Sequence, residues 1–105
     1  NNGFNVTLSS TAPSTLSFAG TVSVNNGALV KGTNLTLQFN SASAYDHNRN
    51  GGTIPVANWD MASNCNIRGI ANTVFTSGFS QTFGNVLWDC ASQSADILFS
   101  SAIGF

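Results

Sequence analysis

The sequence predicts an all-β fold, a small antiparallel β-sandwich or barrel-like domain with one disulfide. Three observations support this prediction. Apolar and polar residues alternate over short stretches, and clusters of Asn, Gly and Ser separate these stretches. In addition, Asn, Ser, Thr and Gly fill 48 of the 105 positions, a composition that disfavours helix interiors. Short strands between frequent turns are typical of two-sheet sandwiches and small barrels.

The segment 1–42 contains the clearest alternation. Residues 4–11 place Phe, Val and Leu at every second position, which is the pattern of a half-buried strand. Residues 15–24 repeat the pattern around Gly20, where we expect a bulge or a bend. A strong turn signal, Asn-Asn-Gly, follows at 25–27, and the alternation resumes over 28–42. This half predicts three or four antiparallel strands.

The second half begins with a predicted long loop at 44–55, which is dense in Asp, Asn, Gly and Pro. Further short strands are expected at 56–62, 72–79, 81–91 and 95–105, although the last segment also has the spacing of an amphipathic helix. A chain of 105 residues has enough apolar side chains for one core. We therefore expect a single secreted β domain over residues 1–105.

Two short segments of the chain have similar sequences. Residues 59–64 and 88–93 share the pattern Trp-Asp-x-Ala-Ser followed by an amide side chain. A duplicated half-domain would extend the match, but Cys65 corresponds to Ser94. The similarity is equally compatible with duplication and with coincidence.

The charge pattern excludes several classes of partner. The chain has three basic and four acidic residues and a net charge of −1, so it offers no cationic surface for nucleic acid or anionic lipid. No apolar run reaches the roughly 18 residues of a transmembrane helix. The chain begins at Asn1 with no charged-then-apolar leader, and we expect a processed, mature form.

Two cysteines and two sequons favour an extracellular location. Cys65 and Cys90 form an even pair, and Asn5 and Asn34 each begin an Asn-x-Thr glycosylation sequon. We predict a Cys65–Cys90 disulfide in a secreted protein, with two buried thiols in a reducing compartment as the alternative. The low-charge, Asn/Ser/Thr-rich composition resembles that of small secreted all-β proteins of microbes, especially fungi, but it contains no family motif.

A calcium loop is only partly matched. Asp46, Asn48 and Asn50 precede a glycine with the spacing of the first calcium ligands of an EF-hand loop. The position of the closing bidentate Glu holds Ala57, and Arg49 would repel a cation. We therefore expect no metal and no cofactor, and an Asx-rich turn is the simpler interpretation.

Catalysis has weak support. His47 is the only imidazole, no Gly-x-Ser-x-Gly nucleophile motif is present, and one His with two distant Cys cannot form an ordinary zinc site. Asp60 and Asp89 could act as a pair of glycosidase carboxylates if they lay about 5–10 Å apart across a groove. The chain is more consistent with a protein that is not an enzyme.

A carbohydrate-binding site requires fewer specific residues than a catalytic site does. Aromatic rings stack on sugar rings, and amides and carboxylates bond their hydroxyls. The residues that supply this chemistry are Tyr45, Asn58, Trp59, Asp60, Asn64, Trp88 and Asp89. We predict a lectin-like protein whose partner is a glycan or a cell-surface glycoprotein. A secreted interaction protein (an effector, toxin or immune-stimulating protein) and a small glycoside hydrolase are the alternatives. The scarcity of Lys at strand edges also predicts a homodimer.

Overall fold

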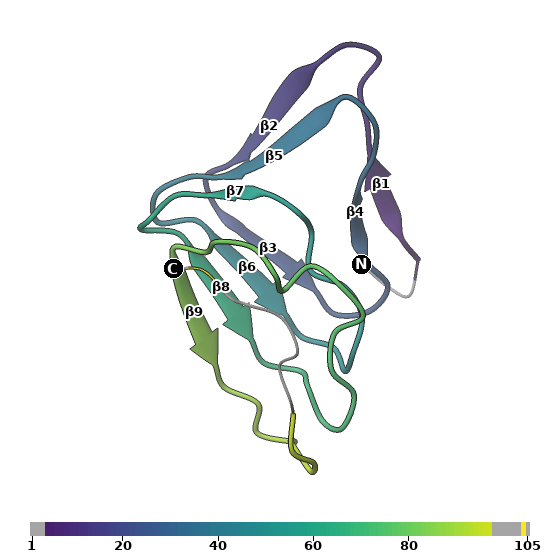
Figure 1. Ribbon diagram of the computed structural model, residues 1–105, viewed down its shortest axis with the longest axis vertical. Coiled ribbons are helices and arrows are strands. Elements are labelled where there is room, and N and C mark those ends of the chain that lie inside the picture. Colours follow the sequence, from purple (N-terminus) through teal and green to yellow (C-terminus); the bar gives the residue numbers. More distant parts are fainter. Residues whose placement is uncertain (1–3, 98–103, 105) are drawn as a thin grey trace.

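The molecule is a parallel β-solenoid, shown in Figure 1. The computed structural model describes residues 4–97 and 104, and within them the chain forms nine strands and no helix. The prediction of an all-β fold is confirmed. The prediction of an antiparallel sandwich is wrong, because every strand pairing among the described residues is parallel. No helix in this part of the chain could cross a membrane.

The nine strands form three sheets. The first sheet pairs β1 (Val6–Leu8) with β4 (Leu29–Lys31). The second has the order β2 (Ser14–Phe18), β5 (Leu35–Phe39), β7 (Asn58–Trp59). The third has the order β3 (Thr21–Val24), β6 (Ala44–His47), β8 (Asn64–Ile67), β9 (Asn85–Trp88).

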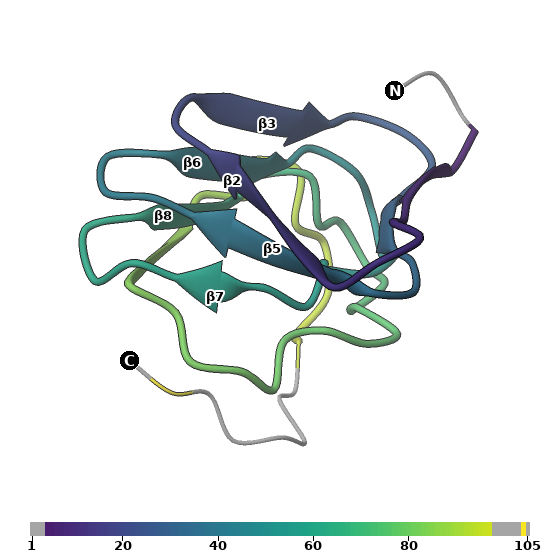
Figure 2. The ribbon, with the colours of Figure 1, turned by 90° about the horizontal axis from the view of Figure 1, so that it is seen from above.

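Over its first two circuits the chain visits the three sheets in turn, and each circuit returns beside the one before it to form one rung of the solenoid. Figure 2 shows the strands of successive rungs stacked along the molecule. Val6 pairs with Leu29, Leu16 with Leu37 and Ala44 with Asn64, so a full circuit of the chain separates the two members of each pair. The turn signals in the sequence therefore mark the corners of rungs. They do not close hairpins, because a parallel neighbour requires a long return path.

One corner repeats with the same hydrogen bonds. The backbone N–H and the hydroxyl of Ser43 both donate to the carbonyl of Asn40, at 3.0 and 2.7 Å. Ser63 donates to the carbonyl of Asp60 in the same way, at 2.9 and 2.7 Å. Both serines are fully buried. The repeat in the sequence is therefore an aromatic residue, Asn or Asp, any residue, Ala and Ser, and it occurs at 39–43 and again at 59–63.

The sequence similarity between residues 59–64 and 88–93 does not correspond to a structural repeat. Trp59 pairs with Phe39 in the second sheet, whereas Trp88 pairs with Ile67 in the third. Asp60 begins a corner turn, and Asp89 follows the end of β9. The two Trp-Asp pairs therefore occupy unrelated positions in the fold.

The core consists of side-chain rows that run from rung to rung. An aromatic row joins Phe18, Phe39, Trp59 and Phe83, with successive ring centroids 4.9, 4.3 and 5.0 Å apart. A second row joins Val22, Tyr45, Cys65 and Val86. The inward residues of the inner rungs are covered by their equivalents in the rungs on either side, and this coverage is how so short a chain buries its core.

The last expected elements differ from the structure or lie outside it. Residues 72–79 form loop, apart from an isolated parallel bridge between Thr53 and Ser77. Of the strand or helix expected at 95–105, residues 98–103 and 105 lie outside the described part of the chain.

Candidate functional site

Trp59 belongs to the aromatic row of the core. Its ring stacks on Phe39 at an interplanar angle of 5°, and Phe83 packs against it at a centroid distance of 5.0 Å. The indole N–H donates to the side-chain oxygen of Gln81 at 2.9 Å. The stacking chemistry predicted for a sugar is thus used inside the protein, because neighbouring rungs supply rings to Trp59.

Trp88 is also half-buried and packs inward. Its ring makes edge contacts with Phe75 and Phe79, at centroid distances of 6.1 and 6.4 Å. Its indole N–H donates to Gln93 at 2.8 Å. Like Trp59, it packs with core rings and has its polar atom satisfied within the chain.

Tyr45 and His47 form a buried polar pair on β6, and neither is exposed. The His47 Nε2 lies 2.7 Å from the carbonyl of Gly51, so this nitrogen carries the proton and donates. The Tyr45 hydroxyl lies 3.2 Å from Nδ1, which accepts. Burial lowers the pKa of His47 below 6.5 and raises that of Tyr45, so both remain neutral. Tyr45 therefore lies away from any surface that a glycan could reach.

The loop that partly matches a calcium-binding pattern is tied to the next rung by hydrogen bonds of its Asn50 side chain. The side-chain oxygen of Asn50 accepts the backbone N–H groups of Ala71, Asn72 and Thr73, at 2.9, 3.2 and 3.0 Å. This amide ties the loop after β6 to the loop after β8 in the next rung. No group of three or more potential metal ligands occurs among the described residues.

The predicted disulfide is wrong, since Cys65 and Cys90 are free thiols. Cys65 points into the core at the level of Val86, and burial raises its pKa to about 12. Cys90 lies further along the chain, beyond the end of β9 at Trp88. Its Sγ contacts the carbonyl of Ile67, the last residue of β8, at 3.3 Å. Cys90 therefore lies at the end of the strands, whereas Cys65 lies near the start of β8. A disulfide needs the two Cα atoms within about 7 Å.

Asp60 and Asp89 lie at opposite ends of the strands. Asp60 precedes β8 and caps its own corner, because its carboxylate accepts the N–H of Ala62 at 2.8 Å. Asp89 follows β9 and forms an exposed ion pair with Arg68 at 3.1 Å. The length of a strand, about 13 Å, separates the two ends, which exceeds the spacing of paired glycosidase carboxylates.

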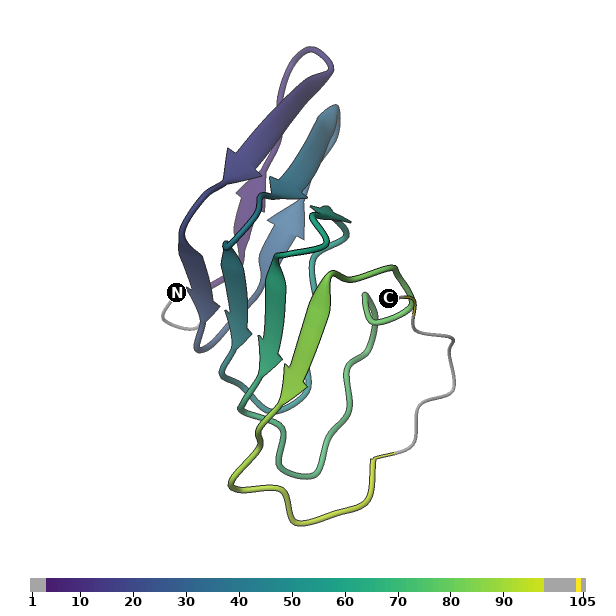
Figure 3. The same ribbon diagram turned by 90° about the vertical axis from the view of Figure 1, so that its left-hand side faces the viewer.

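The outer face of the third sheet carries an array of polar side chains. Figure 3 shows β3, β6, β8 and β9 side by side and running in one direction. We define the polar face as the outward residues of these strands and the residues that directly follow them. They are Thr21, Ser23, Asn25, Ala44, Asp46, Asn48, Asn64, Asn66, Arg68, Asn85, Leu87 and Asp89.

Hydrogen bonds between rungs organise the polar face. The Asn66 amide donates to the Asp46 carboxylate at 2.7 Å, and the Asn48 amide donates to Asn25 at 2.9 Å. Each of these donor amides has a further N–H and an oxygen with which to bond a ligand. Ser23 and Asn66 are not among the residues that the sequence predicts for binding. The corner repeat at 39–43 and 59–63 would have placed Asn66 beside Asp46, whereas the first rung has no such repeat to place Ser23.

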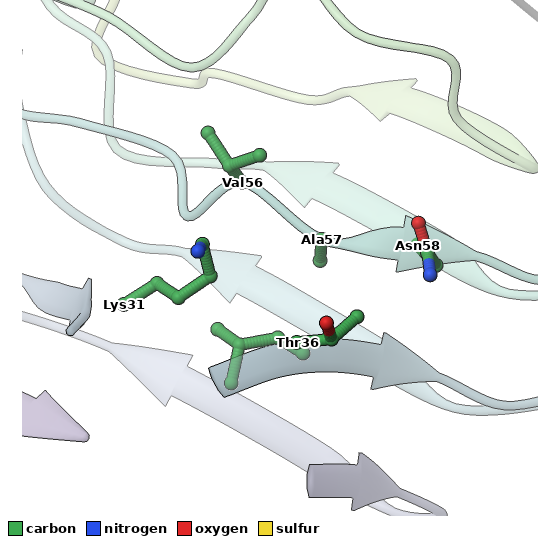
Figure 4. A pocket seen from close by; sticks show the side chains of 6 residues that line it. Lys31, Thr36, Val56, Ala57 and Asn58 are labelled. Atoms are coloured by element: carbon green, nitrogen blue, oxygen red, sulfur yellow. The ribbon is translucent and has the colours of Figure 1, made fainter. Parts of the chain in front are cut away.

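A second feature is a hollow of about 220 Å³ between β5 and the segment that leads into β7. Figure 4 shows Lys31, Thr36, Val56, Ala57 and Asn58 around it, and Leu37 completes the lining. Asn58 is therefore on a different side of the molecule from Asn64. The hollow is smaller than the roughly 300–1,000 Å³ of pockets that enclose a small-molecule ligand.

The two sequon asparagines are both exposed. Asn5 directly precedes β1. Asn34 has a φ of 57° in the turn before β5, a conformation that Asn adopts more readily than most residues. Both positions are sterically open to a glycan.

The comparisons with known proteins assign no function to this chain. No protein-family model, no curated protein and no solved structure matches this chain.

Proposed function

We propose that this protein is a small secreted carbohydrate-binding protein, lectin-like and without catalysis, and that the polar face is its binding surface. The observation that carries the proposal is the arrangement of amide, hydroxyl and carboxylate groups in rows across four parallel strands. Sugar hydroxyls both donate and accept hydrogen bonds, and amide side chains do the same. A face of this composition suits a neutral glycan better than an ionic ligand.

The spacing of the rows supports an extended chain as ligand. Neighbouring strands lie about 4.8 Å apart, and each strand presents its outward side chains at the same height. A linear glycan that lies across the strands would therefore meet a side chain of the polar face at each step. Leu87, with 47% of its surface exposed, supplies an apolar patch for the C–H face of a sugar ring.

This surface revises the predicted set of binding residues. Asn64 and Asp89 belong to the polar face. Trp59 packs from inside against Tyr45 of the third sheet, and Trp88 of β9 packs inward against Phe75. The protein therefore binds through hydrogen bonds along a flat sheet, with little ring stacking.

Secretion, glycosylation at Asn5 and Asn34, and a homodimer remain part of the proposal. Without the Cys65–Cys90 bridge, secretion is supported by the exposed sequons and by the composition alone. The partner is a glycan or a cell-surface glycoprotein.

The alternative is a secreted interaction protein. Val6 and Leu16 on the first rung are 44% and 37% exposed, and apolar surface of this kind favours contact with another protein. A hydrolase that uses Asp60 and Asp89 is disfavoured by the separation of the two strand ends described above.

A glycan array followed by titration calorimetry tests the proposal. We expect binding to a neutral, linear glycan, and we expect Asn66→Leu to weaken that binding at least about tenfold, since it removes an amide from the middle of the polar face. Asn58→Leu is the matched control, because it makes the same change beside the hollow. Loss of binding in the Asn58 variant alone would move the site to the hollow. An array with no binding would contradict the proposal.

A further inference from the structure

The first rung forms an uncovered end of the solenoid. β1, β2 and β3 are each the outermost strand of their sheet among the described residues. Their neighbours β4, β5 and β6 cover one side of them only. Three strand edges on three sides of one rung are therefore available to a partner.

Burial along the rows shows that the described chain leaves the β1 and β2 sides of this end uncovered. Leu37 is 0% exposed, whereas Leu16, its partner one rung earlier in the same row, is 37% exposed. In the first sheet, Leu29 is 8% exposed and its partner Val6 is 44% exposed. The inward side chains Val6 of β1 and Leu16 of β2 thus lack a covering layer on one side, whereas Val24 of β3 is 2% exposed.

The backbone of this rung has hydrogen-bonding groups that point away from the solenoid. In β2, the N–H of Ser14 and the carbonyl of Phe18 bond to the chain of β5. Backbone groups of successive residues in a strand point to opposite edges, so those of Thr15 and Ser17 point outward.

The same analysis applies to β1 and β3. Val6 and Leu8 bond to the chain of β4, and Gly20 and Val24 bond to the chain of β6. The intervening residues, Thr7, Thr21 and Ser23, therefore direct their backbone groups to the free edge.

The strands of the first rung also carry no charged side chain. No Asp, Glu, Lys, Arg or His precedes Lys31 in the sequence. Natural edge strands usually carry charges, especially Lys, that prevent pairing with another chain. No such charge repels a second copy here, and none would attract a charged peptide.

We propose that the first rung binds the first rung of a second copy, so that β1, β2 and β3 of each protomer form a closed, two-fold symmetric interface. A single extended peptide would cover one of the three edges. A rung of a second solenoid has the shape to cover all three strand edges. It would also bury Leu16, which is the exposed end of its inward row. The contact of identical surfaces closes the assembly at two chains. This interface specifies the proposed homodimer, and its test measures association of the chains in the absence of glycan.

Sedimentation analysis and light scattering over a range of concentrations test the interface. The wild-type protein should form a dimer of the 10.9 kDa chain. The variant Ser17→Pro/Ser23→Pro removes two outward N–H groups without touching the inward ladders, and should raise the dimer dissociation constant at least about tenfold. Ser17→Ala/Ser23→Ala is the matched control, because it removes the same hydroxyls and keeps both N–H groups.

Hydrogen exchange gives an independent measurement that needs no variant. The amides of Thr15, Ser17, Thr21 and Ser23 should exchange more slowly as the dimer forms, whereas the amides of the loop at 71–74 should not change. Circular dichroism checks that each variant is folded. A monomer at all concentrations, or a dimer that the folded proline variant leaves unchanged, would overturn the proposal. Loss of glycan binding in a dimeric protein would concern the polar face alone.

Discussion

The first and second rungs have similar side-chain patterns and very different surroundings. Leu16 and Phe18 on β2 are equivalent to Leu37 and Phe39 on β5, and the four residues point into the solenoid. Leu37 and Phe39 are 0% exposed, but Leu16 is 37% exposed and Phe18 is only partly buried. In a solenoid the burial of a side chain depends on whether a rung lies on each side of it, and the residue type alone does not determine it.

The largest expected effect comes from removing an aromatic ring in the second rung. Phe39→Ala should destabilise the protein by about 3–5 kcal/mol, because it opens a cavity between the rings of Phe18 and Trp59. Phe18→Ala makes the same change in the uncovered rung and should cost less than half as much. Urea unfolding of both variants measures the difference. Equal losses would contradict the view that neighbouring rungs determine burial.

Two glycines at equivalent corners give a matched pair of smaller effect. A Cβ at Gly84 would collide with the carbonyl oxygen of Asp60, whereas a Cβ at Gly20 would meet nothing within 4 Å. Gly84→Ala should therefore destabilise the protein by about 1–3 kcal/mol through overpacking. Gly20→Ala should be neutral or slightly stabilising, because it restricts the unfolded chain. Thermal unfolding compares them, and a costly Gly20→Ala would show that the first rung is covered after all.

The next prediction uses the buried His47 of the second rung, whose first-rung partner is Val24. Burial lowers the pKa of His47 in the folded protein, while the unfolded chain binds a proton near pH 6.5. The unfolded state therefore binds more protons as the pH falls below about 6.5, and stability should fall with a slope of up to about 1.4 kcal/mol per pH unit. Above about pH 6.5 the neutral imidazole makes its full contribution to the free energy of unfolding.

Urea unfolding between pH 7.5 and 5 measures this slope. His47→Gln, which cannot titrate, should remove most of it, since His47 is the only histidine in the chain. An unchanged slope in this variant would assign the pH dependence to other groups.

The smallest effect concerns the two thiols, which should contribute no cross-link. Native alkylation should modify the half-buried Cys90 first, because Cys65 is 0% exposed and burial raises its pKa to about 12. Unfolding should make both cysteines reactive, and reductant should leave the unfolding midpoint unchanged. An intact mass that is lower by two hydrogens in the absence of reductant would show that the disulfide forms after all.

The sequence by itself determined that this chain is a β protein with a nearly neutral surface. The alternation in residues 4–11 and 15–24 gives inward and outward faces to strands, and that property is local. It also identified the sequons and the concentration of polar groups around Asp46. A strand has the same alternation in a parallel and in an antiparallel sheet, so the pattern left the direction of pairing undetermined.

Only the tertiary structure decided which residues meet. The register between rungs brings Asp46 beside Asn66, and it places Trp59 between Phe39 and Phe83. The same register puts Cys65 and Cys90 at different levels of the third sheet. These contacts join residues that are distant in sequence, and they depend on the path by which the chain returns to its own edge. The physical reason is that corner turns and hairpin turns use the same residues, Asn, Gly and Ser, while their geometries send the next strand to different partners.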